Sequence, residues 1–222
     1  RQIRKEARQD NGVYRAEMSA YKDEMRALMQ MDTWDEAAVR ALIEERVDSG
    51  LPLKLIDAKA KNKSYNIMTT EQKTKLAEKR AEKMVKRASK KANSDGNRGA
   101  NRLNKMAKRL NLTNDQKLAM GAIFTENKAI REANKAEMQG KRQTLKAIIQ
   151  APEFDEEAWL AFHAENKQAN VEKALARAKS NYDILSLLDD DQKQQFAKMM
   201  KKAKHKKGGK RGGEHKKKGR QS

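Results

Sequence analysis

Apolar residues near the start of the chain recur at the spacing of a helix. Within residues 1–30 they are separated by four, three, four and three positions, which places them on one face. This stripe comprises Tyr14, Met18, Tyr21, Met25 and Leu28. We expect the stripe to pack against a neighbouring helix, and in a protein with a small core the same residues can also bind a ligand. Residues 1–30 are therefore predicted to form one helix.

Polar residues then divide the chain into further helices. Thr33 and Glu36 have the spacing of a capping box, which predicts a helix that starts at Thr33. Gly50 and Pro52 predict that this helix breaks or kinks, because proline removes a backbone donor. Another helix is expected to run from there to Ile67.

Three later helices are predicted to open in one manner. At each start an apolar residue precedes a Thr or Asp N-cap, and Gln follows the cap by three positions. The three boxes are Met68, Thr69 and Gln72; Leu112, Thr113 and Gln116; and Leu188, Asp189 and Gln192. Lysine occupies the position where a hydrophobic staple needs an apolar residue. The leading Met or Leu is therefore expected to pack against another helix.

The two halves of the chain align without a gap at an offset of 120 residues, which indicates an internal duplication. Residues 16–18 and 136–138 are both Ala-Glu-Met, and Gln72 aligns with Gln192. By the same register, the box at Leu112 should have a counterpart just before Arg1.

Two places depart from this register. Tyr65 pairs better with Tyr182, at an offset of 117 residues, so we expect compensating length changes between the third helix and the last box. The break at Gly50 has no counterpart in the residues that align with it, 170–172.

The composition of two segments sets the predicted domain boundaries. Residues 93–101 lack apolar periodicity and are rich in Asn, Ser, Asp and Gly, as in a flexible linker. The end of the chain has almost nothing to bury and is expected to be disordered. The prediction is a first helical repeat over residues 1–92 whose first box lies upstream, a linker over 93–102, a second repeat over 103–204 and a basic tail over 205–222.

Composition favours long helices with a thin core. The 222 residues are 37% hydrophobic, 37% charged and 5% aromatic, and the chain is rich in helix formers, so we predict an all-α protein. The absence of cysteine excludes disulfides, thiolate metal sites and a Cys nucleophile. No run is apolar enough to span a membrane, and no signal-like stretch follows Arg1, so we expect a trimmed or mature form.

The net charge of +20 is concentrated in two segments. Residues 201–222 carry eleven Lys or Arg against one acidic residue, and residues 73–109 carry fourteen against three. Each basic segment follows an apolar-x-x-x-Gln box, so the charge repeats with the motif.

The paired boxes resemble those of the Spy/CpxP family, in which a Leu-Thr-x-x-Gln motif occurs twice per domain and flanks a long helical hairpin. Residues 65–73, Tyr-Asn-Ile-Met-Thr-Thr-Glu-Gln-Lys, look like the second motif of the family. Residues 110–117, Leu-Asn-Leu-Thr-Asn-Asp-Gln-Lys, look like the first. The resemblance covers about 200 residues as two domains in tandem, and it departs from the family pattern where Asp189 replaces Thr.

The resemblance implies a periplasmic, all-helical, cradle-shaped protein that needs no cofactor. Family members are ATP-independent chaperones or envelope-stress adaptors that bind unfolded or misfolded proteins on a basic, partly apolar concave face. Some restrain a sensor kinase, which makes a regulatory adaptor the nearest alternative function. We infer that two helical-hairpin repeats in one chain form a cradle that relatives build by dimerisation, either as a monomeric pseudo-dimer or within a homodimer.

Candidate client-binding residues combine adaptable apolar side chains with cations that attract acidic chains. For each one, packing in the core or a solvated basic face is an equally good explanation. The candidates are the stripe of Tyr14, Met18, Tyr21, Met25 and Leu28; its counterpart of Met138, Leu145 and Ile148; and the basic residues Lys79, Arg80, Lys83, Arg87, Lys90 and Lys91.

No metal site or catalytic site is predicted. His163 aligns with Ile43 and is expected to be a packing residue, while His205 and His215 lie among lysines that repel a divalent cation. The acidic groups at helix starts are explained by capping, and no phosphate loop or nucleophile elbow is present.

Two other interpretations follow from charge alone. A pI of about 10.0 is typical of a protein that binds nucleic acid non-specifically. The basic segments lack interleaved aromatic residues for base stacking, so no specific nucleic acid is expected. The basic tail could instead hold the protein weakly to an anionic membrane.

Overall fold

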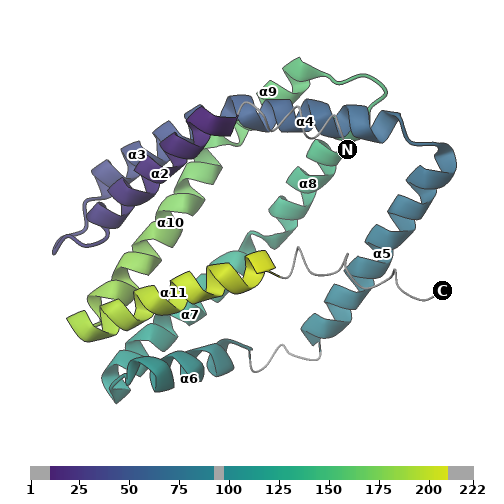
Figure 1. The fold of residues 1–222 in the computed structure, drawn as a ribbon. Coiled ribbons are helices and arrows are strands. Elements are labelled where there is room, and N and C mark those ends of the chain that lie inside the picture. Colours follow the sequence, from purple (N-terminus) through teal and green to yellow (C-terminus); the bar gives the residue numbers. More distant parts are fainter. Residues whose placement is uncertain (1–10, 93–97, 210–222) are drawn as a thin grey trace, which may run out of the picture.

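The computed structural model describes the backbone of residues 11–92 and 98–209 and the side chains of residues 16–89 and 99–199. Every regular element in these segments is an α-helix, which confirms the predicted all-α class. The helices are α2 (Asn11–Leu28), α3 (Glu36–Ser49), α4 (Leu51–Asn66), α5 (Thr70–Ala92), α6 (Arg98–Leu110), α7 (Asn114–Ala133), α8 (Lys135–Gln150), α9 (Glu156–Glu165), α10 (Lys167–Ser186) and α11 (Asp190–Gly209) (Figure 1).

Three pairs of consecutive helices form long, bent rods. The junction residues Gly50, Asn134 and Asn166 have near-helical backbone angles, for example φ −80° and ψ −9° at Gly50, so the axis bends without turning back. Pro52 lies in the first turn of α4, where a backbone N–H has no partner within the helix, so proline costs no hydrogen bond there. The predicted break at Gly50 is confirmed.

The three predicted capping boxes are present. Thr113 accepts the N–H of Gln116 at 3.2 Å, and the Gln116 side chain accepts the N–H of Thr113 at 2.9 Å. The same two bonds join Thr69 and Gln72. In the last box the Asp189 carboxylate accepts the N–H of Gln192 at 2.8 Å, and the Gln192 side chain accepts the N–H of Asp189.

The predicted start of α3 is wrong by two residues. The N-cap is Asp35, whose carboxylate accepts the N–H of Ala38 at 2.9 Å, and the helix begins at Glu36. Aspartate is as good a cap as Thr, and the extended backbone of Asp35 places its carboxylate against the first turn. Asp155 caps α9 in the same way.

Helix ends in the two halves keep the offset of 120 residues, so no length change is needed. Helices α4 and α10 end at Asn66 and Ser186, and the expected offset of 117 at Tyr65 is therefore wrong. The break at Gly50 also has a counterpart, at Asn166, which lies about one helical turn earlier than the alignment predicts. The sequence did not indicate this bend, because Asn166 stands there and the second half has no equivalent of Gly50 and Pro52.

The two halves pack against each other through two pairs of helices. Helix α3 lies beside α10, and α4 lies beside α8, so each half covers the other (Figure 1). The α3–α10 seam holds a core cluster of Val39, Ile43, Val171, Leu175 and Ala178. Along the same seam Arg40 pairs with Glu172, and Lys167 pairs with Asp48.

Each half also holds a turn of the other half. Asn62 and Asn66 donate to the carbonyl of Ala151 at 2.8 and 3.0 Å. In the opposite direction, the Tyr182 hydroxyl donates to the carbonyl of Asp32 at 2.7 Å. Asn62 and Tyr182 are both buried and are 120 residues apart, so equivalent positions fix equivalent turns.

A second core cluster belongs to the second half. Helices α6, α7, α10 and α11 contribute its buried residues and the partly buried residues around them. Leu112 and Leu188, the leading residues of two boxes, both pack here, as predicted. The cluster's buried members are Met106, Leu110, Met120, Ile184 and Leu188.

The predicted linker and tail are partly helical. Residues 98–102 form the first turns of α6, because the docked apolar face of that helix, with Leu103 and Met106, supports the helix back to Arg98. Residues 205–209 continue α11, as lysine is a good helix former. Residues 1–10, 93–97 and 210–222 lie outside the described residues.

Candidate functional site

The second and third boxes join into one hydrogen-bonded pair. The side chains of Gln116 and Gln192 exchange hydrogen bonds at 2.8 and 3.1 Å, and Gln116 also donates to the carbonyl of Leu187. Gln192 is buried, so its amide needs these partners. The glutamine of the motif is therefore a structural residue that ties the start of α7 to the start of α11. Gln72, at the start of α5, is exposed.

The stripe of α2 faces the protein. Met25 and Leu28 pack against the cluster at the α3–α10 seam. Met18 and Tyr21 are half-buried, and the Tyr21 ring lies 4.6 Å below the guanidinium of Arg46. The side chain of Tyr14 lies outside the described residues. Packing against the rest of the protein explains the apolar character of this stripe. A client could contact only the exposed parts of these side chains.

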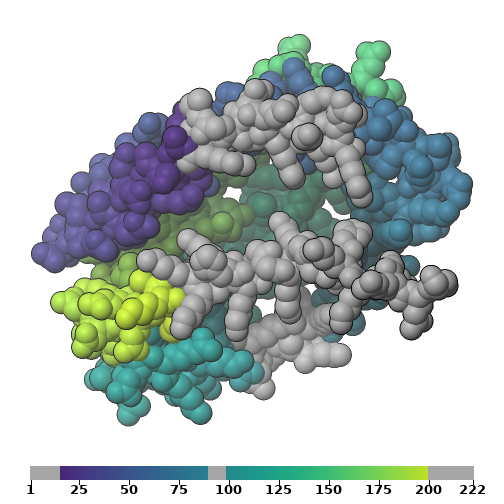
Figure 2. Space-filling model, viewed as in Figure 1, coloured from purple at the N-terminus to yellow at the C-terminus, as the bar shows by residue number. Residues whose placement is uncertain are grey.

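Helix α5 is the most accessible element of the described chain. No described helix packs extensively along it, and it forms an edge of the molecule (Figures 1 and 2). Every side chain from Ala77 to Ser89 is exposed, including Met84 and Val85 at 65% and 68%. Ile67, just before the helix, is 73% exposed.

The charges of α5 are sorted between two faces. At 3.6 residues per turn, Glu71, Glu78 and Glu82 lie within about 40° of one another, and Glu71 and Glu82 pair with nearby lysines. Arg80, Lys83 and Arg87 lie roughly opposite, within about 60°. No carboxylate in the described segments pairs with these three cations, which we call the α5 basic stripe.

Lys79 is exposed beside this stripe, and the side chains of Lys90 and Lys91 lie outside the described residues. All six predicted basic residues thus lie on α5, and the four whose side chains are described are exposed.

A second basic cluster lies between α8 and α10. The Lys173 ammonium donates to the sulfur of Met138 at 2.9 Å. Burial lowers the pKa of Lys173, and the nearby cations Arg177 and Arg142 lower it further. Met138 was predicted as a client contact, but Lys173, Arg142 and Arg177 were missed. They are scattered over two helices of the second half, and only the folding of that half brings them together.

The other predicted apolar residues of α8, Leu145 and Ile148, are half-buried. They share α8 with Met138, and α4 packs along this helix.

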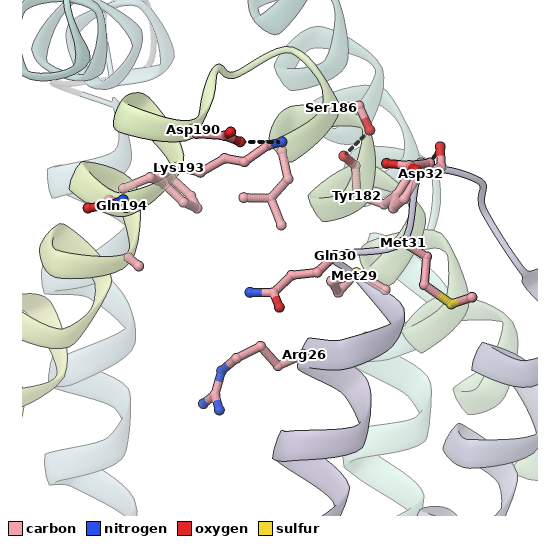
Figure 3. A pocket seen from close by; sticks show the side chains of 13 residues that line it. Arg26, Met29, Gln30, Met31, Asp32, Tyr182, Ser186, Asp190, Lys193 and Gln194 are labelled. Atoms are coloured by element: carbon pink, nitrogen blue, oxygen red, sulfur yellow. Dashed lines mark hydrogen bonds and ion pairs between the residues drawn. The ribbon is translucent and has the colours of Figure 1, made fainter.

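A pocket of about 750 Å³ lies where α2, α10 and α11 meet (Figure 3). Its walls include the buried Tyr182 and the half-buried Met29, Leu185 and Phe196. Exposed polar side chains surround these apolar residues: Arg26 from α2, Gln30 from the turn after α2, and Lys193 and Gln194 from α11. The sequence did not reveal this pocket, because its walls come from both halves of the chain.

His163 is a packing residue, as predicted. Its ring lies 4.0 Å from that of Trp159 and 5.4 Å from that of Phe162. Burial lowers the pKa of His163, and the charge of Lys54 on α4 lowers it further. Within the described residues, no group of three or more His, Asp or Glu side chains is arranged to hold a metal ion. The side chains of His205 and His215 lie outside them.

None of the described helices is both long and apolar enough to cross a bilayer. No curated protein and no solved structure matches the chain. Residues 98–200 match the model of a family described as LTXXQ motif family protein. This range contains both the Leu112-Thr113-x-x-Gln116 box and the Asp189 box that pairs with it. Residues 98–200 of this chain therefore belong to the LTXXQ motif family.

Proposed function

We propose that the protein is an ATP-independent chaperone of the periplasm, which binds unfolded or misfolded envelope proteins during envelope stress. The α5 basic stripe carries this proposal. Three unpaired cations beside the exposed Met84 offer both charge and apolar surface to a flexible chain. A helix that serves only to fill a core does not leave thirteen consecutive side chains exposed.

The cluster of Lys173, Arg142 and Arg177 supplies a second contact for acidic segments. Like charges gathered around a partly buried lysine are relieved when an anion approaches. Binding through such surfaces is fast, weak and sensitive to salt, which suits the capture and release of clients without nucleotide. The two interlocked halves would present these surfaces as one cradle.

The test is suppression of aggregation of a chemically unfolded client, at low and high salt and without nucleotide. We compare the full chain with the variant Arg80→Gln/Lys83→Gln, which removes two of the three cations of the stripe. The control variant is Lys75→Gln/Lys86→Gln. The control removes the same charge from the same helix, at positions paired with Glu71 and Glu82. A chain that ends at Lys201 measures the contribution of the tail.

The expected result is protection by the full chain that weakens with salt, falls several-fold in the stripe variant and survives in the control. An equal loss in both variants would show that net charge alone matters. Absence of protection by the full chain would overturn the proposal. Protection that vanishes with the tail would favour non-specific binding of polyanions, which a nucleic-acid binding assay would then measure.

A further inference from the structure

The pocket between α2, α10 and α11 has an apolar interior, and its rim carries the cations Arg26 and Lys193 together with the carboxylates of Asp32 and Asp190 (Figure 3). We propose that it binds a long-chain carboxylate, with the hydrocarbon chain against Met29, Leu185 and Phe196 and the carboxylate between Arg26 and Lys193. This site is separate from the α5 basic stripe and does not depend on client binding.

The interior of the pocket favours a hydrocarbon over a peptide. The Tyr182 hydroxyl already donates to the Asp32 carbonyl, and the Ser186 hydroxyl donates to the Tyr182 carbonyl. The remaining interior side chains, Met29, Leu185 and Phe196, offer no N–H or O–H. A peptide would bury amide groups there without partners, at a cost that a hydrocarbon chain does not incur.

The rim offers two cations to a carboxylate. Arg26 approaches from α2 and Lys193 from α11, on facing walls of the pocket (Figure 3). Their present partners, Asp23 and Asp190, lie on the same helices as the cations, and all four side chains are well exposed. Such ion pairs contribute little to stability, so a ligand carboxylate can join or replace them. The amides of Gln30 and Gln194 add further donors.

The size and flexibility of the pocket suit a chain-like ligand. A volume of about 750 Å³ falls within the range of small-molecule sites. Met29 and Met31 are unbranched and adapt to different chain shapes. The walls come from α2 of the first half and from α10 and α11 of the second, so occupation of the pocket would also join the two halves.

The test uses dansylaminoundecanoic acid, whose fluorescence rises in an apolar site, titrated into the full chain. Ala197→Trp fills the pocket from an exposed position on its wall. Arg26→Gln/Lys193→Gln removes the rim charges. The matched control, Lys22→Gln/Lys198→Gln, removes one exposed cation from each of the same helices outside the pocket. Circular dichroism confirms that each variant is folded.

We expect saturable binding that Ala197→Trp abolishes and that the control leaves unchanged. The rim variant should weaken binding about tenfold, because it removes both charged donors that face the carboxylate. The methyl ester of the probe has no carboxylate to meet the cations. Its affinity for the full chain should therefore be as low as the affinity of the acid for the rim variant. Absence of saturable binding, or binding that survives Ala197→Trp, would overturn the proposal. Equal affinity for acid and ester would overturn the role of Arg26 and Lys193.

Discussion

Helices α11 and α5 begin with the same capping chemistry and end in different surroundings. Both start at a Gln-closed box, 120 residues apart. On α11, Phe196 and Met199 pack against the cluster that contains α6. The aligned residues of α5 are Leu76 and Lys79, and the side chains of α5 are exposed from Ala77 to Ser89.

The comparison separates what the motif does from what its helix does. The box fixes where the helix starts and how it leaves the preceding turn, because its hydrogen bonds are local. Whether the helix then becomes a wall of the core or a free surface depends on two or three side chains in its next turns. The motif is thus a structural device, and the helix after it is where function can diverge.

The largest difference between the two surroundings should appear on truncation of an apolar residue. Leu110→Ala opens a cavity in the second cluster, where the leucine is 1% exposed, and should lower the free energy of unfolding by about 2–5 kcal/mol. Ile67→Ala, at 73% exposure beside α5, should change it by about 0.5 kcal/mol or less. Urea unfolding measures both, and comparable losses would show that α5 is covered in solution.

The second largest difference in stability is expected between the glutamines of the last box and of the first. Gln192→Ala leaves Gln116 without its partner in a partly buried site and should cost about 1–3 kcal/mol. Gln72→Ala removes one bond of an exposed box and should cost about 0.5 kcal/mol. The double variant Gln116→Ala/Gln192→Ala should lose less than the sum of its single changes, since the pair acts as a unit. Additive losses would contradict the pairing.

The two aspartate caps provide a comparison in which no difference is expected. Asp35→Ala and Asp155→Ala each remove one bond to the first turn of an equivalent helix and should each cost about 1 kcal/mol. Thr33→Ala should have almost no effect, because Thr33 is exposed and α3 begins after Asp35. A large loss from Thr33→Ala, measured by thermal unfolding, would restore it as the cap.

The smallest effect should be on the pH dependence of stability, to which His163 of the second half contributes and the aligned Ile43 of the first half does not. The pKa of His163 is lowered in the folded protein, so the unfolded chain takes up a proton first as the pH falls below about 6.5. Stability should therefore decrease below that pH and level off once the folded histidine is also protonated. His163→Gln should flatten this part of the profile, and the aligned residue Ile43 contributes nothing to it. An unchanged profile in urea unfolding at several pH values would show that His163 is not the group responsible.

The sequence predicted the features that depend on neighbouring residues. The boxes at Thr69, Thr113 and Asp189 could be recognised because cap and partner are three positions apart. The same reasoning chose Thr33 over Asp35, since both are good caps and the sequence does not show which one has the extended backbone. The bend at Asn166 was missed because asparagine is a weak signal for a bend.

The features that depend on the packing of distant helices could not be predicted. The basic cluster needs α8 beside α10, and the pocket needs α2 beside α11. A charge or an apolar residue can be read from the sequence, but the neighbours that it gains from other helices cannot. The α5 basic stripe is intermediate: its periodicity is visible in the sequence, and its exposure is not.

The turns that the two halves exchange have a consequence for the peptide connection between them. Because Asn62 holds Ala151 and Tyr182 holds Asp32, neither half completes its own surface. A cut in the chain between Ala92 and Arg98 would leave two fragments that complement each other, as two subunits do. The connection then acts as a tether that sets the effective concentration of the fragments, and the interlocked helices supply the affinity.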